Sequence, residues 1–254
     1  ARLVVRTYAV ESEQVGTPVR LAVLTDLHAC AYGEGQKNLL DAVAVQCPDL
    51  VLLCGDIVDD DPRMPEERAL ATVEALAEVW PVYYVTGNHE FWTGRVEEIR
   101  ELLRARGAVV LEGESAAVTA AGQTLRIGGI DDPNVGEDIW REQLETVTAA
   151  QDGEAFSILL THRPERVEDY AGRGFDLVLA GHAHGGQWRL PGLINGLIAP
   201  NQGLFPRYAG GRYALDGDTT MIVSRGLARE STRIPRLFNR PELVVVDILP
   251  EGTA

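Results

Sequence analysis

The sequence predicts an α/β (α+β) fold, in which two mixed β-sheets pack together and are flanked by helices as a four-layer αββα sandwich. Two observations support this prediction. The first part of the chain alternates short apolar runs, typical of buried strands, with longer segments that have the apolar spacing of helices. The second part is richer in strand-like runs, which are broken by Gly, Pro and Asn-Gly turns.

The first part of the chain is expected to alternate three strands with three helices. The strands are predicted at Val19–Thr25, Leu50–Cys54 and Val82–Thr86, and the helices at Gln36–Gln46, Pro65–Val79 and Arg95–Arg106. Apolar residues recur every three or four positions in each helix, so each has one face that can pack on a sheet. This order implies a sheet with covering helices.

The second part supplies the remaining strands. They are predicted at Ala116–Thr119, Thr124–Ile130, Ser157–Leu160, Leu177–Leu179, Met221–Ser224 and Leu243–Ile248, with a helix at Asp138–Ala149, a short helix near Pro164 and hairpins from Gln187 onward. No linker, low-complexity tract or fixed repeat divides the 254 residues. We therefore expect one domain, residues 1–254.

The chain is strongly acidic, with 23 basic and 38 acidic residues and a formal charge of −15. Its arginines are scattered, apart from a modest cluster of Arg225, Arg229, Arg233, Arg236 and Arg240. Such a surface repels nucleic-acid backbones, so we expect no nucleic-acid partner. An acidic protein that binds phosphate needs a concentrated positive charge, and metal ions can supply it.

The sequence has no apolar run long enough to span a membrane. It begins with Ala1 rather than Met, so we expect that an upstream segment, such as a signal peptide or anchor, has been removed.

Five predicted strands are followed by short polar motifs that together contain all five histidines. These motifs are Asp26-Leu-His28, Gly55-Asp56-Ile-Val-Asp59, Gly87-Asn88-His89-Glu90, Thr161-His162 and Gly181-His182-Ala-His184. Ligands of α/β sheets collect at the carboxyl ends of strands, so these motifs are expected to converge. Carboxylate, amide and imidazole groups together suit Mn, Fe, Zn or Co. A single histidine after a strand is usually structural. Here all five histidines of the chain follow predicted strands and lie in motifs with carboxylates, which indicates a metal site.

Spacing and small residues also fit this site. Asp26 and His28 are expected to point to the same side, as positions i and i+2 of a strand do, and His182 and His184 repeat that spacing. The glycines before Asp56, Asn88 and His182 are expected to leave room for sharp turns.

At these residues the sequence resembles the calcineurin-like metallophosphoesterase superfamily. The signature of that superfamily is D-x-H, G-D-x-x-D, G-N-H-[ED], a later H and G-H-x-H, and all five blocks occur in order between Asp26 and His184. The segments "TDLHACAYGEGQKNLLDAV", "CPDLVLLCGDIVD", "GIDDP", "AGHAHGGQWRLP" and "PRLFNRPELVVVDI" further resemble the bacterial YkuE/YaeI-type phosphodiesterase branch. The resemblance covers nearly the whole chain and implies the metallophosphoesterase fold.

The resemblance implies a hydrolase of phosphate esters with two divalent metal ions. It places one metal on Asp26, His28, Asp56 and His184 and the other on Asp56, Asn88, His162 and His182, with Asp56 as the bridge. A hydroxide between the metals would attack phosphorus. His89 would act as an acid at the leaving group, and Asp59 would orient it.

The branch favours a phosphodiesterase that acts on a small phosphate ester, with lipid-linked or nucleotide-linked headgroups as one expectation. Three alternatives stay open: a non-catalytic scaffold with this fold, a phosphomonoesterase, and a nuclease of the same superfamily. Branch members commonly begin with a membrane helix or export signal, so membrane association through an N-terminal segment absent from this chain is also expected. The sequence predicts no particular oligomeric state.

Several charged residues lie beside these motifs and are not expected to bind the metals. Asp60 and Asp61 are expected to be solvated turn residues, and Asp131 and Asp132 to be turn or cap residues. Arg163 directly follows His162 and can either contact substrate phosphate or form a surface ion pair.

Overall fold

The computed structural model describes residues 2–190, 193–216, 218–229 and 235–253. The described strands form two six-stranded sheets and one two-stranded ribbon. The first sheet has the order β1 (Val4–Ser12), β14 (Glu242–Pro250), β2 (Val19–Leu24), β3 (Leu50–Cys54), β4 (Val82–Val85) and β5 (Ala108–Val110). The second has the order β12 (Gly211–Ala214), β13 (Thr220–Val223), β9 (Leu177–Ala180), β8 (Phe156–Leu160), β7 (Gln123–Gly129) and β6 (Ser115–Ala120).

Both sheets are mixed. Strands β2, β3, β4 and β5 are parallel, whereas β14 runs antiparallel to β2. In the second sheet β7, β8, β9 and β13 are parallel, and the edge strands β6 and β12 are antiparallel to their neighbours. The carboxyl ends of the central strands therefore point to one end of each sheet.

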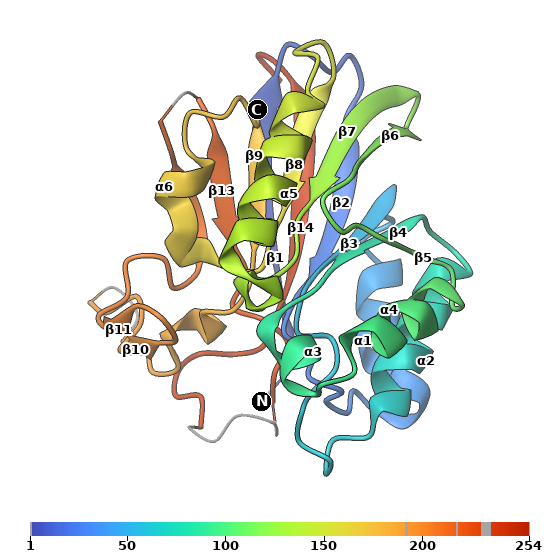
Figure 1. The fold of residues 1–254 in the computed structure, drawn as a ribbon, viewed down its shortest axis with the longest axis vertical. Helices are drawn as coiled ribbons and strands as arrows, with labels where there is room; N and C mark the ends of the chain where they lie inside the picture. The colour runs from blue at the N-terminus through green and yellow to red at the C-terminus, as the bar shows by residue number, and fades with distance from the viewer. Residues whose placement is uncertain (1, 191–192, 217, 230–234, 254) are drawn as a thin grey trace.

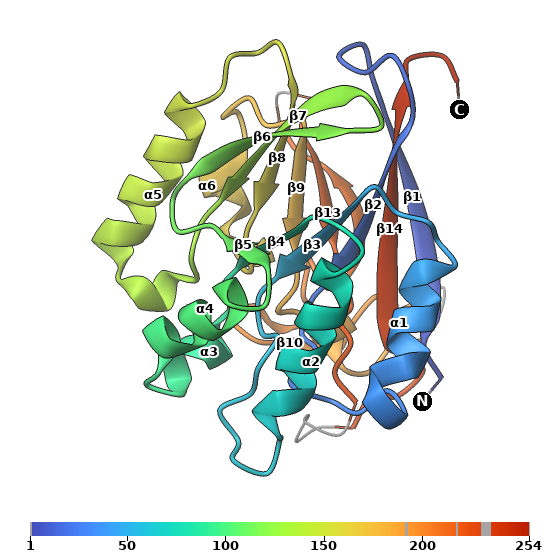
Figure 2. The same ribbon diagram turned by 90° about the vertical axis from the view of Figure 1, so that its right-hand side faces the viewer.

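Helices cover the outer face of each sheet, as Figures 1 and 2 show. Helices α1 (Lys37–Ala44), α2 (Glu66–Ala77) and α4 (Val96–Arg104) pack on the first sheet, and α5 (Glu137–Ala149) and α6 (Val167–Tyr170) pack on the second. Short helical turns lie at η1 (Glu34–Gln36), η2 (Pro133–Val135), η3 (Pro164–Arg166) and η4 (His184–Gly186). The predicted four-layer αββα sandwich is confirmed.

Strand β3 shows why the buried strands read as continuous apolar runs. Leu50, Leu52 and Cys54 point into the core between the two sheets, and Val51 and Leu53 point into the core beneath the helices. Alternate side chains leave opposite faces of a strand, and both faces of this strand are covered. The five residues are consequently all buried.

Three strands were not expected from the sequence. Strands β5 and β12 are short, and β12 alternates half-buried with exposed positions. Strand β1 lies at a sheet edge, and the arginine and glutamate on its exposed positions obscure its pattern. Hairpins after Gln187 were expected, and the ribbon of β10 (Ile198–Ala199) and β11 (Gly203–Leu204) is one of them.

None of the helices in the described ranges is both long and apolar enough to cross a membrane. Of the predicted arginine cluster, Arg233 lies outside the described residues.

Candidate metal centre

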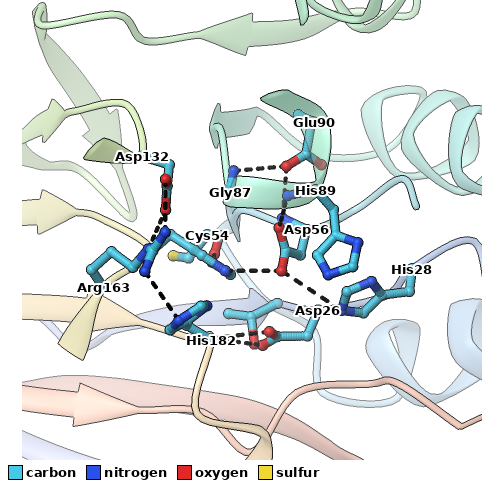
Figure 3. Close-up of polar contacts among 12 residues, drawn as sticks. Asp26, His28, Cys54, Asp56, Gly87, His89, Glu90, Asp132, Arg163 and His182 are labelled. Atoms are coloured by element: carbon cyan, nitrogen blue, oxygen red, sulfur yellow. Dashed lines mark hydrogen bonds and ion pairs between the residues drawn. The ribbon is translucent and has the colours of Figure 1, made fainter. Parts of the chain in front are cut away.

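The polar motifs meet where the two sheets present their carboxyl ends to each other (Figure 3). Asp26 and His28 follow β2, Asp56 follows β3, His162 follows β8, and His182 and His184 follow β9. Asn88 and His89 begin the short helix α3 (Asn88–Trp92) after β4. All the predicted metal-ligand residues are buried, and His89, whose side chain is 21% exposed, is the most exposed of the five histidines.

Left-handed backbone turns bring the motifs together. Asp26, His28, Asp56, His182 and His184 all have positive φ, between 46° and 64°. Non-glycine residues seldom adopt this conformation, and it is found where surrounding structure enforces it at functional sites. Asp26 and His28 do reach the same cluster, as predicted, but through left-handed turns and not through the i, i+2 spacing of a strand.

Neighbouring motif loops are joined to each other by backbone hydrogen bonds. The amide of Asp26 donates to the carbonyl of Gly55 at 3.0 Å, and the amide of His28 donates to the carbonyl of Asp56 at 2.9 Å. These bonds extend the β2–β3 pairing beyond the regular strands and fix the two loops side by side.

Glu90 joins the loops after β3 and β4. Its fully buried carboxylate accepts from the amides of Asp56 (3.0 Å), Ile57 (2.8 Å), Val58 (3.2 Å) and Gly87 (2.7 Å). Gly87 must be glycine here, because a Cβ at this position would lie 2.5 Å from the backbone nitrogen of Asp56.

The predicted ligands form two clusters that share Asp56. Ligand atoms of Asp26, His28, Asp56 and His184 all lie within 4.8 Å of one another, as do those of Asp56, His162 and His182. Asp56 Oδ2 lies 3.0 Å from His162 Nε2 and 3.7 Å from His28 Nε2. One carboxylate oxygen thus faces both clusters.

The close contact between His162 and Asp56 is unfavourable unless a positive charge lies between the two side chains. His162 Nδ1 lies 2.7 Å from the carbonyl oxygen of Cys54, to which only an N–H can donate. In a neutral ring, Nε2 then carries a lone pair that faces the carboxylate of Asp56. Although burial opposes it, Asp56 raises the pKa of His162 to about 10, so the surroundings favour a cation at this position.

Orphaned ligand atoms support the same conclusion. His28 Nε2, Asp56 Oδ2, Asn88 Oδ1 and His162 Nε2 are buried and lack a hydrogen-bond partner among the described residues. Buried polar atoms are normally paired, and metal ligation satisfies such groups. The donor set therefore fits divalent cations of the Mn, Fe or Zn type.

Asn201 and Arg163 fix the orientation of His182. Asn201 Oδ1 lies 2.8 Å from His182 Nε2 and accepts from Arg163 Nη1, also at 2.8 Å. Arg163 Nη1 also lies 3.3 Å from His182 Nε2, but the Asn201 oxygen is nearer, so the contacts favour the tautomer with its proton on Nε2 and Nδ1 left to ligate. Arg163 is itself held by the buried carboxylate of Asp132, through Nη2 at 3.0 Å and through Nε. Arg163 is thus buried, and a surface ion pair is ruled out.

Asp59 and Asp60 make their shortest contacts with different histidines. The sequence had predicted that Asp59 would orient His89. Asp59 Oδ2 lies 2.8 Å from His28 Nδ1, whereas Asp59 Oδ1 lies 3.8 Å from His89 Nδ1. The shorter contact to His89 Nδ1, at 2.6 Å, comes from Asp60, which we expected to be a solvated turn residue. Asp59 therefore orients His28 first, and Asp60 is the nearer partner of His89.

The local charges favour a protonated His89. Burial lowers its pKa, but hydrogen bonding to Asp59 and the charges of Asp56, Asp59 and Asp60 outweigh this and raise the pKa to about 9. The side chain of Trp92 lies beside it, with ring centroids 4.7 Å apart. The charges around His89 thus favour its cationic form, and it is the most exposed histidine of the cluster.

The sequence did not predict the contacts that Glu90, Asp60 and Asn201 make at this centre, although Asp60 is exposed as expected. The [ED] position of G-N-H-[ED] was a usable signal for Glu90. Asn201 had no signal beyond its place in a Gly/Pro-rich loop, since only the fold brings it to His182. Asp132 does cap η2 as expected, by accepting from the amide of Asn134, but its contact with Arg163 was not foreseen.

Comparison with known proteins identifies the family. A sequence model described as calcineurin-like phosphoesterase matches residues 19–186, which include every predicted metal ligand. The chain belongs to the calcineurin-like phosphoesterase family. It is accordingly a metallophosphoesterase, a hydrolase of phosphoric ester bonds.

Relatives support the expected branch of this family. The phosphodiesterase YaeI of Escherichia coli is 29% identical over 91% of this chain and 83% of its own length. The metallophosphoesterase YkuE of Bacillus subtilis is 28% identical over 89% of this chain and 77% of its own. A metallophosphoesterase of Campylobacter jejuni is 28% identical over 96% of this chain, but the chain spans only 63% of that relative.

Among solved structures, a dimetal phosphatase from Danio rerio superposes with a TM-score of 0.53. The two chains share 14% identity, over 82% of this chain and 87% of the other. This likeness shows the common fold.

Proposed function

We propose that this metallophosphoesterase hydrolyses phosphodiesters at a dinuclear metal centre. The observation that carries the proposal is the position of Asp56 Oδ2, which faces both ligand clusters at 3.0 and 3.7 Å from a histidine nitrogen of each. A carboxylate is the ligand that can bind two cations at once, so this geometry favours two metals over one.

In this proposal each cation has its own set of ligands and shares Asp56. Asp26, His28 and His184 would hold the first, and Asn88, His162 and His182 would hold the second. When bound, the cations supply Lewis-acid chemistry: they lower the pKa of water and neutralise charge on phosphate oxygens. Mn, Fe and Zn all suit the donor set.

The protein itself would bind, orient and protonate the substrate. His89 would donate its proton to the leaving oxygen, since it is the most exposed of the five histidines, its surroundings favour the cation, and Asp60 and Asp59 lie beside Nδ1, which leaves Nε2 for the substrate. Asn201 and Arg163 would keep His182 in the tautomer that ligates.

The preference for diesters rests on the relative named phosphodiesterase YaeI. It is tested by comparing hydrolysis of bis(p-nitrophenyl) phosphate with that of p-nitrophenyl phosphate in the presence of Mn²⁺. The proposal predicts faster turnover of the diester. Faster turnover of the monoester would instead assign a phosphomonoesterase, and metal-dependent activity on neither ester would indicate a scaffold.

A further inference from the structure

Exposed apolar side chains gather in three segments beside the metal centre, at residues 188–193, 204–205 and 237–238. Of the thirteen exposed large apolar residues in the described ranges, seven lie between positions 188 and 238. The most exposed are Leu193 (86%), Phe238 (75%), Leu204 (66%) and Phe205 (65%). Trp188 and Leu237 are also exposed. Single exposed apolar residues are ordinary, but a concentration of this kind marks an interaction site.

The segments that carry these side chains are joined to each other by hydrogen bonds. The backbone of Leu237 donates to Gln187 and accepts from Arg189, at 3.2 and 3.0 Å, and the Trp188 indole donates to the carbonyl of Pro235. Strands β10 and β11 are joined to the same segments, because the amide of Phe205 donates to the carbonyl of Leu197 and that of Leu197 to Trp188. In Figure 1 this ribbon, α3 and the N-terminus all lie in the lower half of the molecule.

The charge of this part of the chain is opposite to that of the rest. Residues 188–240 contain eight arginines and three acidic residues, a net charge of +5, while the remaining residues carry −20. Arg225 is ion-paired with Glu242, but Arg207, Arg229, Arg236 and Arg240 form no ion pair with a carboxylate of the described ranges. Many arginines elsewhere, such as Arg95 and Arg104, are paired with glutamates.

Carboxylates greatly outnumber arginines in this protein, so arginines without carboxylate partners are unexpected. Of these four arginines, Arg207, Arg229 and Arg240 are exposed, whereas Arg236 is half-buried. Their accumulation beside protruding Leu and Phe side chains therefore indicates an anionic partner with an apolar interior.

We propose that the surface formed by Trp188, Leu193, Leu204, Phe205, Leu237 and Phe238, with the arginines among them, docks onto an anionic lipid bilayer. Leu and Phe side chains at loop tips can enter the acyl region, Trp prefers the interface, and arginines attract anionic headgroups. Screening confines these attractions to about 10 Å at 0.1 M salt, so the acidic remainder of the protein does not cancel them. A nucleic acid would use the arginines but not the protruding aliphatic side chains.

The docking surface borders the metal centre. Gln187 directly follows η4, which contains His184, and Arg236 Nη2 lies 3.3 Å from His184 Nδ1. A bilayer at this surface would bring lipid headgroups to the edge of the ligand clusters. The docking inference itself rests on the loops and their charges and does not require the proposed activity.

Sedimentation of the 254-residue chain with vesicles tests the inference. Vesicles of phosphatidylcholine with phosphatidylglycerol are expected to bind the chain in a salt-sensitive manner, and vesicles of phosphatidylcholine alone to bind it at least about tenfold more weakly. A double Phe205→Ser, Phe238→Ser variant and a double Arg207→Glu, Arg229→Glu variant should each lose about tenfold or more in partitioning.

Matched controls lie on other faces. A double Val45→Ser, Ile139→Ser variant removes exposed apolar residues, and Lys37→Glu reverses an exposed charge; both should bind as the unchanged chain does. Thermal unfolding and hydrolysis of a soluble ester report whether each variant is folded.

Three results would overturn the docking inference: no sedimentation with anionic vesicles, equal losses in the controls, or retention on DNA without binding to vesicles. Vesicle binding by a chain that hydrolyses no ester would refute the proposed function and leave the docking surface standing.

Discussion

Asp60 Oδ1 lies 2.6 Å from His89 Nδ1, whereas Asp59 makes its shorter contact, at 2.8 Å, with His28. The two adjacent carboxylates therefore support different parts of the centre: Asp59 supports a proposed metal ligand, and Asp60 supports the proposed acid.

Replacing each of these carboxylates separately should give different defects. Asp59→Ala is expected to weaken binding of the first metal by about 10–100-fold, because a carboxylate behind a ligating histidine fixes its tautomer and basicity. Asp60→Ala should leave metal affinity unchanged and lower turnover. Calorimetric titration with Mn²⁺, followed by kinetics at saturating metal, separates the two effects. If Asp60→Ala lowers metal affinity as much as Asp59→Ala does, this division of roles is wrong.

Replacing His89 tests its role at the leaving group. His89→Asn should retain both metals and lose about 10²–10⁴-fold in turnover of a diester with an alkoxide leaving group. The loss should be much smaller for p-nitrophenolate, which departs without needing a proton. An equal loss for both leaving groups would show that His89 does not act as the acid.

Much of this centre was predictable because its residues follow strands at fixed short distances. Asp26, Asp56 and His162 each come after an apolar run, and the sheets carry them to one place. The predicted strand β3 matches at both ends, since it is buried on two faces and reads as a continuous apolar run. Edge strand β1 was missed because its exposed face carries charges.

What the sequence could not provide was contact between distant segments. Asn201 lies 19 residues beyond His182, in the turn that joins β10 and β11, and only the packing of that ribbon brings it to His182. The pairing of Asp59 with His28 likewise depends on left-handed turns that no strand or helix period encodes.

Asn201 should prove necessary for binding of the second metal. Asn201→Ala removes the acceptor for His182 Nε2–H, so His182 can adopt the other tautomer, and affinity at the second site should fall about 10–100-fold. Asn201→Asp keeps an acceptor oxygen in a residue that tolerates positive φ, and it should retain most of the affinity. Two-phase Mn²⁺ titrations measure the outcome, and identical behaviour of the two variants would contradict it.

Glu90 should matter for folding even without metal. Each carboxylate oxygen of Glu90 accepts hydrogen bonds from two buried backbone amides. In Glu90→Gln an NH₂ group replaces one of these oxygens, so at least two amides lose their acceptor. The free energy of unfolding should fall by at least about 2 kcal/mol. Urea unfolding in the presence of a chelator measures it, with the exposed Glu101→Gln as the matched control, for which about 0–1 kcal/mol is expected. A change in Glu90→Gln no larger than in the control would contradict the structural role.

The central claim, that Asp56 bridges two cations, is tested most directly by metal stoichiometry. Elemental analysis of the Mn²⁺-loaded and desalted chain should give two metals per chain, and His184→Asn, which alters one cluster only, should give one. Asp56→Ala removes the shared ligand and should lose both metals while remaining folded by circular dichroism. One metal per chain in the unchanged protein, or an Asp56→Ala variant that keeps its metals, would contradict the dinuclear account.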